Sequence, residues 1–288
     1  MGLRDDIRQH YPTLSPALQQ VARLVLDRPN DVVTASMRSV GARAGLTPAT
    51  LVRFAQHLGF AGWPELKAAA ADELGLGPEP YGERARALVG RARDRSLARE
   101  LFDVHRRNLD ATEHQSTAKL QGACALLEKA RTVHVAGYRA CYPIAFSLVY
   151  LYRLFRASVY LLDGPGGSLE MQQRAVEKGD VLVVISFAPY SREALQTAEA
   201  ARAAGARIVA LTDSEASPLS LLADQTLLFS IRSPSFFPSA AAGMALAEAL
   251  IELLASRAGK TVVQRIDRAE TQLFESGAYL QAPKLRAG

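Results

Sequence analysis

Five short aliphatic runs follow one another after Arg131, and a stretch with helical periodicity separates each run from the next. The runs are Val133 to Ala136, Ser158 to Leu162, Val181 to Ile185, Ile208 to Leu211 and Thr226 to Phe229. Runs that are apolar on both faces are typical of strands buried in a parallel sheet, and right-handed crossovers place helices on both sides of such a sheet. This part of the chain is therefore predicted to be an α/β doubly wound domain with a five-stranded parallel sheet.

The amino-terminal part has a different pattern, because apolar residues recur at helical spacing from Leu14 to about Leu74. Breaks at 28–30, at Gly45 and at 58–62 divide this pattern into short helices, so an all-α domain is predicted. Gly and Pro then concentrate in residues 75–82, which is typical of a linker. With 288 residues, of which 49% are hydrophobic, the chain is long enough for two cores.

These patterns predict four parts of the chain. Residues 1–76 form the helical domain, 77–115 a linker with connecting helices, 116–275 the α/β domain and 276–288 a carboxy-terminal tail. Separate helices are expected over 84–95, 96–113 and 117–129. Cysteine is sparse and the first residues lack the apolar core of a signal peptide, so a cytoplasmic protein is expected. No uninterrupted apolar run approaches the length of a membrane-spanning helix, which needs about 20 residues.

Residues 36–54 have the pattern of two short helices joined by a tight turn. Gly45 stands where the chain needs a positive φ, and Gly41 lacks a side chain where two helices would cross closely. Thr47 is a suitable N-cap, and Pro48 at the first helical position has no amide hydrogen to leave unsatisfied. The second helix is therefore predicted to start at Pro48.

The second helix has two different faces. Leu51, Phe54, Ala55 and Leu58 share the face expected to pack, while Ala49, Thr50, Arg53 and His57 share the face expected to be open. Between Asp31 and Glu65 the sequence has no acidic residue but has three arginines, and this local positive charge favours contact with phosphates. The alternative is an ordinary three-helix unit whose arginines are solvated.

The same residues resemble the amino-terminal domain of the RpiR/MurR family of bacterial regulators. The resemblance runs from about residue 10 to 75 and includes the string His57-Leu-Gly-Phe-Ala-Gly-Trp-Pro-Glu-Leu-Lys67. In that family the helix corresponding to Pro48 to Leu58 enters the major groove, which implies base or phosphate contacts. The predicted partner is thus a double-stranded DNA operator, and the predicted DNA-binding residues are Arg38, Thr47, Pro48, Ala49, Thr50 and Arg53.

Residues from about 120 to 257 resemble the sugar isomerase (SIS) domain that this family carries as its sensor. The resemblance lies in the strand order and in the strings Val135-Ala-Gly137, Val184-Ile-Ser186, Thr212-Asp213 and Ser217-Pro-Leu219. It implies a small anionic effector, a phosphosugar or a carboxylate. Because SIS domains commonly dimerise, it also implies a homodimer or homotetramer.

The carboxyl ends of the strands are where ligands of doubly wound sheets bind, which directs attention to the loops after Gly137, Ser186 and Thr212. In SIS domains the first loop usually reads G-x-G-x-S, whereas here it reads Gly137-Tyr138-Arg139-Ala-Cys141. A guanidinium at a helix start can still bind phosphate or carboxylate. The alternative is that Arg139 simply faces solvent.

The second family loop, S-x-S-G-x-T, is replaced by Ser186-Phe-Ala-Pro-Tyr190-Ser191. Pro189 has no amide hydrogen to donate to an anion, so the ligand is expected to differ from an ordinary phosphosugar. Tyr190 either offers a hydroxyl or a stacking face to the ligand or packs within the protein. Ser239, before a long apolar helix, is either an N-cap or a ligand hydroxyl. The predicted ligand-binding residues are Gly137, Tyr138, Arg139, Cys141, Ser186, Tyr190, Ser191 and Ser239.

The leading hypothesis is a DNA-binding transcription regulator that is not an enzyme; the alternative is a sugar-phosphate isomerase or related SIS-domain enzyme. An isomerase needs a base beside the substrate carbon, and Glu193 and Glu170 lie near candidate loops, but each is interpreted as a solvated residue near a helix start. The histidines are scattered without ligand spacing, so no metal and no cofactor are predicted.

Overall fold

A computed structural model describes residues 2–34, 37–73 and 81–280 of the chain. All five predicted strands are present, and their bounds differ from the aliphatic runs by at most one residue at either end. They are β1 (Val133–Gly137), β2 (Val159–Leu161), β3 (Val181–Ile185), β4 (Arg207–Thr212) and β5 (Gln225–Leu228). Most of the predicted linker at 75–82 and residues 281–288 of the predicted tail lie outside the described residues.

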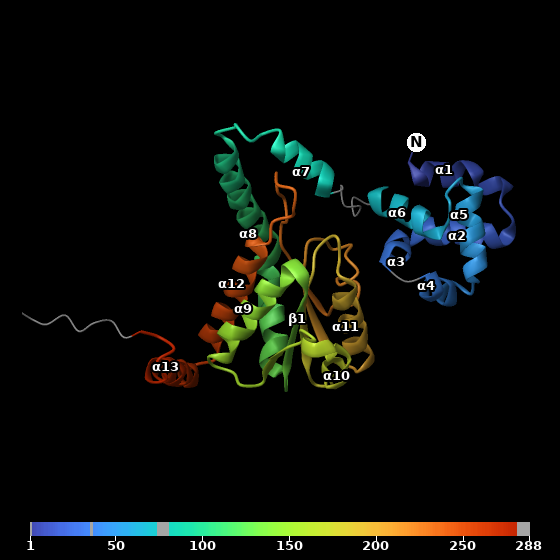
Figure 1. Ribbon diagram of the computed structural model, residues 1–288. Coiled ribbons are helices and arrows are strands. Elements are labelled where there is room, and N and C mark those ends of the chain that lie inside the picture. Colours follow the sequence, from blue (N-terminus) through green and yellow to red (C-terminus); the bar gives the residue numbers. More distant parts are fainter. Residues whose placement is uncertain (1, 35–36, 74–80, 281–288) are drawn as a thin grey trace, which may run out of the picture.

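The strands form one sheet in the order β2-β1-β3-β4-β5, and every neighbouring pair is parallel. Helices cover both faces, as predicted (Figure 1). The helices of this part are α8 (Leu97–Lys129), α9 (Tyr142–Arg153), α10 (Leu169–Arg174), α11 (Arg192–Ala203), α12 (Ala241–Arg257) and α13 (Lys260–Glu275), with short 3-10 turns at Arg139–Cys141 and Pro165–Gly167. The strand order reverses between β1 and β3, so the loops after these two strands meet at a topological switch point.

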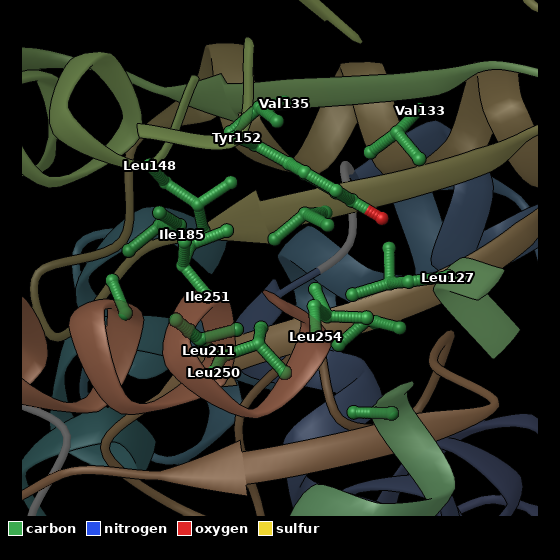
Figure 2. Packing of buried hydrophobic residues seen from close by; sticks show 14 of the residues in the cluster. Leu127, Val133, Val135, Leu148, Tyr152, Ile185, Leu211, Leu250, Ile251 and Leu254 are labelled. Carbon is green, nitrogen blue, oxygen red and sulfur yellow. The ribbon is translucent and has the colours of Figure 1, made fainter. Parts of the chain in front are cut away.

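Alternate residues of each strand build two separate cores. Val133, Val135 and Ile185 point to the face covered by α8, α9 and α12, where Figure 2 shows Leu127, Tyr152 and Leu254 around them. Ala136, Leu182 and Val184 point to the other face and pack against alanines of α11. Because both faces are covered, the strands are apolar throughout, which is why their runs stand out in the sequence.

A single long helix, α8, replaces the two helices expected over 96–113 and 117–129. Its buried polar side chains explain the difference. Asn108, Thr112 and Ser116 recur every four residues and form hydrogen bonds with the backbone or a side chain of β5 and the segment after it. The helix thus covers the free edge of the sheet, and the predicted boundary between 115 and 116 falls inside it.

The amino-terminal part is all-α, as predicted. Its helices are α1 (Leu3–His10), α2 (Pro16–Asp27), α3 (Pro29–Thr34), α4 (Met37–Ala44), α5 (Pro48–His57) and α6 (Trp63–Glu73), with a 3-10 turn at Tyr11–Thr13. Ile7, Val21, Phe54 and Trp63 are among its fully buried residues. A further helix, α7 (Tyr81–Val89), precedes α8. Within the described ranges, every helix is too short or too polar to cross a bilayer.

Candidate functional site

The turn between α4 and α5 has the predicted backbone geometry. Gly45 has a φ of +65°, in the left-handed region that favours glycine. A Cβ on Gly41 would lie 2.6 Å from the carbonyl oxygen of Leu46, so the close approach at Gly41 is to the turn itself. A side chain at either position would disturb the angle between the two helices.

The start of α5 is capped by threonine hydroxyls. The backbone N–H of Thr50 donates to Thr47 Oγ1 at 3.3 Å, and the two hydroxyl oxygens lie 2.9 Å apart. Pro48 occupies the first turn, as expected. Thr50 is buried, with 6% of its surface exposed, so its placement on the open face is wrong. At the third position of a helix the side chain reaches back to the cap, and here this contact encloses Thr50.

The remaining predicted DNA-binding residues lie on the surface. Thr47, Pro48, Ala49 and Arg53 of α5 are exposed, as is Arg38 of α4. Within the described residues, neither Arg38 nor Arg53 forms an ion pair with a carboxylate, so both guanidinium groups remain available to phosphates. Leu51, Phe54 and Ala55 are fully buried, which confirms the packed face.

A pocket of about 420 Å³ lies at the switch point between the β1 and β3 loops. It is lined by Tyr81, Tyr138, Arg139, Ala140, Cys141, Ser186, Phe187, Pro189, Tyr190, Ser191, Arg192 and Phe237. Six of the predicted ligand-binding residues are among them, whereas Gly137 and Ser239 are not. The loops after β1 and β3 supply these six residues, and the segment before α12 enters the pocket through Phe237 rather than Ser239.

The first loop keeps a glycine-type backbone although it carries an arginine. Arg139 has a φ of +55°, a conformation that side chains rarely adopt, at the place where SIS domains have their second glycine. Gly137 ends β1 beneath the loop, and a Cβ there would lie 2.7 Å from the Cys141 carbonyl oxygen and 2.8 Å from Ala145 Cβ. The tight turn is thus retained while a cation is added to it.

Arg139 is not a free guanidinium at this pocket. Its side chain is 74% exposed, and Nη2 donates to Glu193 Oε1 at 2.9 Å. The backbone N–H of Glu193 holds the pKa of its carboxyl below the ordinary value; burial opposes this and the Arg139 guanidinium supports it. Glu193, considered in the sequence as a possible base, is therefore the partner of Arg139. Glu170 is exposed and lies near Arg174 in its own helix.

Cys141 stands where the family has a serine. It is 4% exposed, and burial raises the pKa of its thiol to about 12. The side chain is therefore a neutral, weakly polar part of the pocket wall near neutral pH.

The second loop uses many of its own donors. Ser191 caps α11 by accepting the backbone N–H of Ala194 at 3.1 Å, and its own N–H donates to Ser186 Oγ at 3.2 Å. Tyr190 donates its hydroxyl to Asp213 at 2.9 Å, and the N–H of Ala188 also points to this carboxylate, at 3.4 Å. Burial, followed by Asp213, raises the pKa of Tyr190. Its hydroxyl is thus already bound within the protein.

Ser239 has a structural partner of its own. Its Oγ accepts the backbone N–H of Ala241, the first residue of α12, at 3.3 Å and lies 3.1 Å from His105 Nδ1 of α8. The N-cap of α12 is Ala240, so Ser239 is not the N-cap itself; its hydroxyl accepts the first amide of the helix from one residue earlier. Elsewhere, no three His, Cys, Asp or Glu side chains among the described residues are grouped so that they could hold a metal ion.

Sequence reasoning found Tyr138 and Tyr190 but missed three other aromatic residues of the pocket, Tyr81, Phe187 and Phe237. Tyr81 of α7 and Phe237, in the loop before α12, have ring centroids 5.0 Å apart, and the orange loop rises beside α7 in Figure 1. Phe187 lies edge-on to Phe237 at 6.3 Å. The signal that could have found this wall is the Phe236-Phe237 pair, since two aromatic residues in a loop of serines and prolines are unusual.

Comparison with known proteins identifies both parts of the chain. The model of the helix-turn-helix domain of the rpiR family matches residues 1–76, and that of the SIS domain matches residues 126–253. The chain combines the helix-turn-helix domain of the rpiR family with a SIS domain. It is a helix-turn-helix transcription regulator with a SIS domain as its α/β part, as the resemblance implied.

Individual relatives match most of this chain. The transcriptional regulator HexR of Pseudomonas aeruginosa is 26% identical over 76% of this chain and 75% of its own length. The bifunctional protein glk of Burkholderia mallei is 28% identical over 72% of this chain, which spans only 32% of glk. The structure of Vibrio vulnificus NanR in complex with ManNAc-6P has a TM-score of 0.60 at 17% identity and covers 96% of this chain and all of NanR. The last comparison shows the fold alone.

Proposed function

We propose that this protein binds a double-stranded operator with α5 and binds a small anionic metabolite in the pocket between the β1 and β3 loops. The observation that carries the proposal is the exposed face of α5, on which Arg53 lies one turn from Ala49. Its start is fixed by a proline and a threonine cap, so side chains on this face are held in place for contact with base edges. Such a protein works where the chromosome is, in the bacterial cytoplasm.

The effector site is proposed from position and charge. Helix N-termini and guanidinium groups beside a switch point favour negative charge. HexR and NanR, two regulators similar to this chain, support the sensor role, and the ligand named with NanR is a phosphorylated sugar derivative. A homodimer or homotetramer is part of the proposal, because symmetric regulators present two recognition helices to two half-sites.

Arg53→Ala is expected to weaken operator binding by about 1 to 3 kcal/mol without unfolding the helical domain. The reason is that Arg53 is exposed while the packed face of α5 is formed by its neighbours. DNase protection of the DNA upstream of the protein's own gene locates the operator, and gel retardation measures the change. The wild-type footprint should contain two related half-sites separated by one helical turn, about 34 Å, or a multiple of it.

Two matched variants complete this experiment. Arg8→Ala removes an exposed arginine of α1 and should leave operator affinity unchanged. Thr50→Ala keeps the backbone N–H that donates to Thr47 but loses the contact between the two hydroxyls, and should lower the stability of the helical domain by about 1 kcal/mol. A wild-type chain that protects no upstream sequence, or Arg53→Ala with wild-type affinity, contradicts the assignment of α5.

The enzyme alternative predicts turnover of a sugar phosphate. We expect none on common hexose and pentose phosphates, because Glu193 is engaged with Arg139 and its lowered pKa makes it a weak base. A coupled assay for aldose-ketose conversion checks this. Turnover by the wild type that is lost in Glu193→Gln would restore the isomerase hypothesis.

A further inference from the structure

One wall of the pocket is built from aromatic side chains. Tyr81 and Phe237 pack ring against ring, Phe187 lies edge-on to Phe237, and Tyr138 stands beside Arg139. A sugar ring needs a hydrogen-bonding partner for each hydroxyl that is removed from water, and a hydroxyl left without one costs about 1 to 3 kcal/mol. Aromatic walls instead favour a flat, apolar body.

The polar groups of the pocket are mostly used inside the protein. The hydroxyl of Tyr138 lies 2.9 Å from Thr197 Oγ1, and that of Tyr190 donates to Asp213. Ser186 and Ser191 each accept a backbone N–H and keep one O–H to donate. This arrangement leaves two hydroxyl donors close together, which can serve one anionic group and few others.

The formal charges around the pocket cancel, so a dianion is disfavoured more than a monoanion. Arg139 and Arg192 supply two cations, while Glu193 and Asp213 bring two carboxylates to the same loops. The backbone amides that would wrap a phosphate are reduced as well, because Pro189 has none and those of Ala188 and Ser191 already have acceptors. A dianionic phosphate therefore finds less compensation here than a carboxylate does.

We propose that this pocket binds an aromatic carboxylate, with the carboxylate held by Ser186, Ser191 and Arg139 and the ring placed against Tyr81 and Phe237. The pocket volume of about 420 Å³ suits one ring with a short side chain. The inference rests on the proposed function of the pocket as the sensor site. Of the two classes of effector considered from the sequence, a phosphosugar or a carboxylate, it selects the carboxylate and adds an aromatic ring.

Titration calorimetry of the full chain tests the class of ligand. The probes are benzoate, phenylacetate and phenylpyruvate, with benzyl alcohol as the uncharged ring and glucose 6-phosphate and inorganic phosphate as the phosphorylated comparison. At least one aromatic carboxylate should bind about 10-fold more tightly than glucose 6-phosphate and benzyl alcohol. If none of the three binds, or if glucose 6-phosphate binds more tightly than all of them, the proposal is wrong.

Variants then test the two halves of the site with the best aromatic probe. Tyr81→Leu should weaken binding about 2- to 10-fold, whereas Tyr81→Phe keeps the ring and should bind as the wild type does. Arg139→Ala should weaken it about 10-fold or more, and all three variants should show the thermal transition of the wild type. Equal affinity of Tyr81→Leu and Tyr81→Phe removes the aromatic wall from the site.

The same measurements also test, separately from the class of ligand, whether the pocket is the sensor site. Tight binding of glucose 6-phosphate that is weakened by Arg139→Ala overturns the aromatic class and keeps the anion pocket. If no anion binds and the DNA footprint persists, the pocket is not the sensor, and both the inference and that part of the proposed function fail.

Discussion

Asp180→Ala is expected to lower the free energy of unfolding of the α/β domain by about 3 kcal/mol. The Asp180 carboxylate is 1% exposed at the start of β3 and accepts hydrogen bonds from Arg131 Nε at 3.1 Å, His134 Nε2 at 3.2 Å and the Glu177 N–H at 2.9 Å. Its removal leaves the buried His134 without this partner, while Nδ1 of the same ring has no partner among the described residues. Arg131 is 58% exposed, so water replaces its lost bond and the effect falls at the lower end of the usual range.

The same carboxylate gives the domain a defined dependence on acid. Burial would raise the pKa of Asp180, but the hydrogen bonds from Arg131, the Glu177 amide and His134 outweigh it and hold the pKa below the ordinary value of 3.8. A group whose pKa is lowered by folding contributes its full stability above the unfolded pKa and loses it as the pH falls through the folded pKa. The wild type should therefore lose stability below about pH 4 more steeply than Asp180→Asn.

Hydrogen exchange of peptides from β1 and β3 measures this effect in the α/β domain alone, at pH 7 and at steps below pH 5. Asp110→Ala, which removes an exposed carboxylate of α8, is the matched control and should exchange as the wild type does. Equal protection of β1 and β3 in Asp180→Ala and Asp110→Ala would show that the buried carboxylate contributes nothing.

Local patterns determined how much of this fold could be predicted. The five strands were found because each is apolar on both faces over a few residues, and the cap of α5 because Thr47 and Pro48 are adjacent in sequence. Thr50 was misplaced because a helical projection shows which way a side chain leaves the axis, but not that a hydroxyl can turn back to its cap. The same limit hid the continuity of α8, whose buried polar residues are matched only by groups of β5 and of the segment after it, more than 100 residues away.

The position of the pocket, after β1 and β3, followed from the sheet topology. The predicted lining was incomplete because segments distant in the sequence also contribute to it. Tyr81 and Phe237 lie more than 150 residues apart in the sequence and meet only in the folded protein. The ion pair of Arg139 with Glu193 likewise joins two loops. Spacing within one loop predicts which groups are present at a site, but the partners that neutralise them come from the rest of the fold.

Ser116→Ala is expected to lower the stability of the α/β domain by about 2 kcal/mol or more. Ser116 is fully buried, and its hydroxyl accepts the N–H of Leu228 at 2.7 Å and donates to the carbonyl oxygen of the same residue at 2.7 Å. Because β5 is an edge strand, these backbone groups have no strand on that side to pair with. Alanine leaves both of them buried without a partner, and each such group costs about 1 to 3 kcal/mol.

Thr117→Ala is the matched control, since the neighbouring hydroxyl is exposed and donates only to Glu113 of its own helix. The two variants make the same kind of change one residue apart, so an equal loss of stability in thermal unfolding would contradict the role of the Ser116 contact. The loss should also extend beyond β5, because Asn108 donates to the carbonyl oxygen of Arg232 at 2.7 Å further along the same edge. Residues 229–240, which lead to Phe237 in the pocket, should therefore exchange their amide hydrogens faster in Ser116→Ala than in Thr117→Ala.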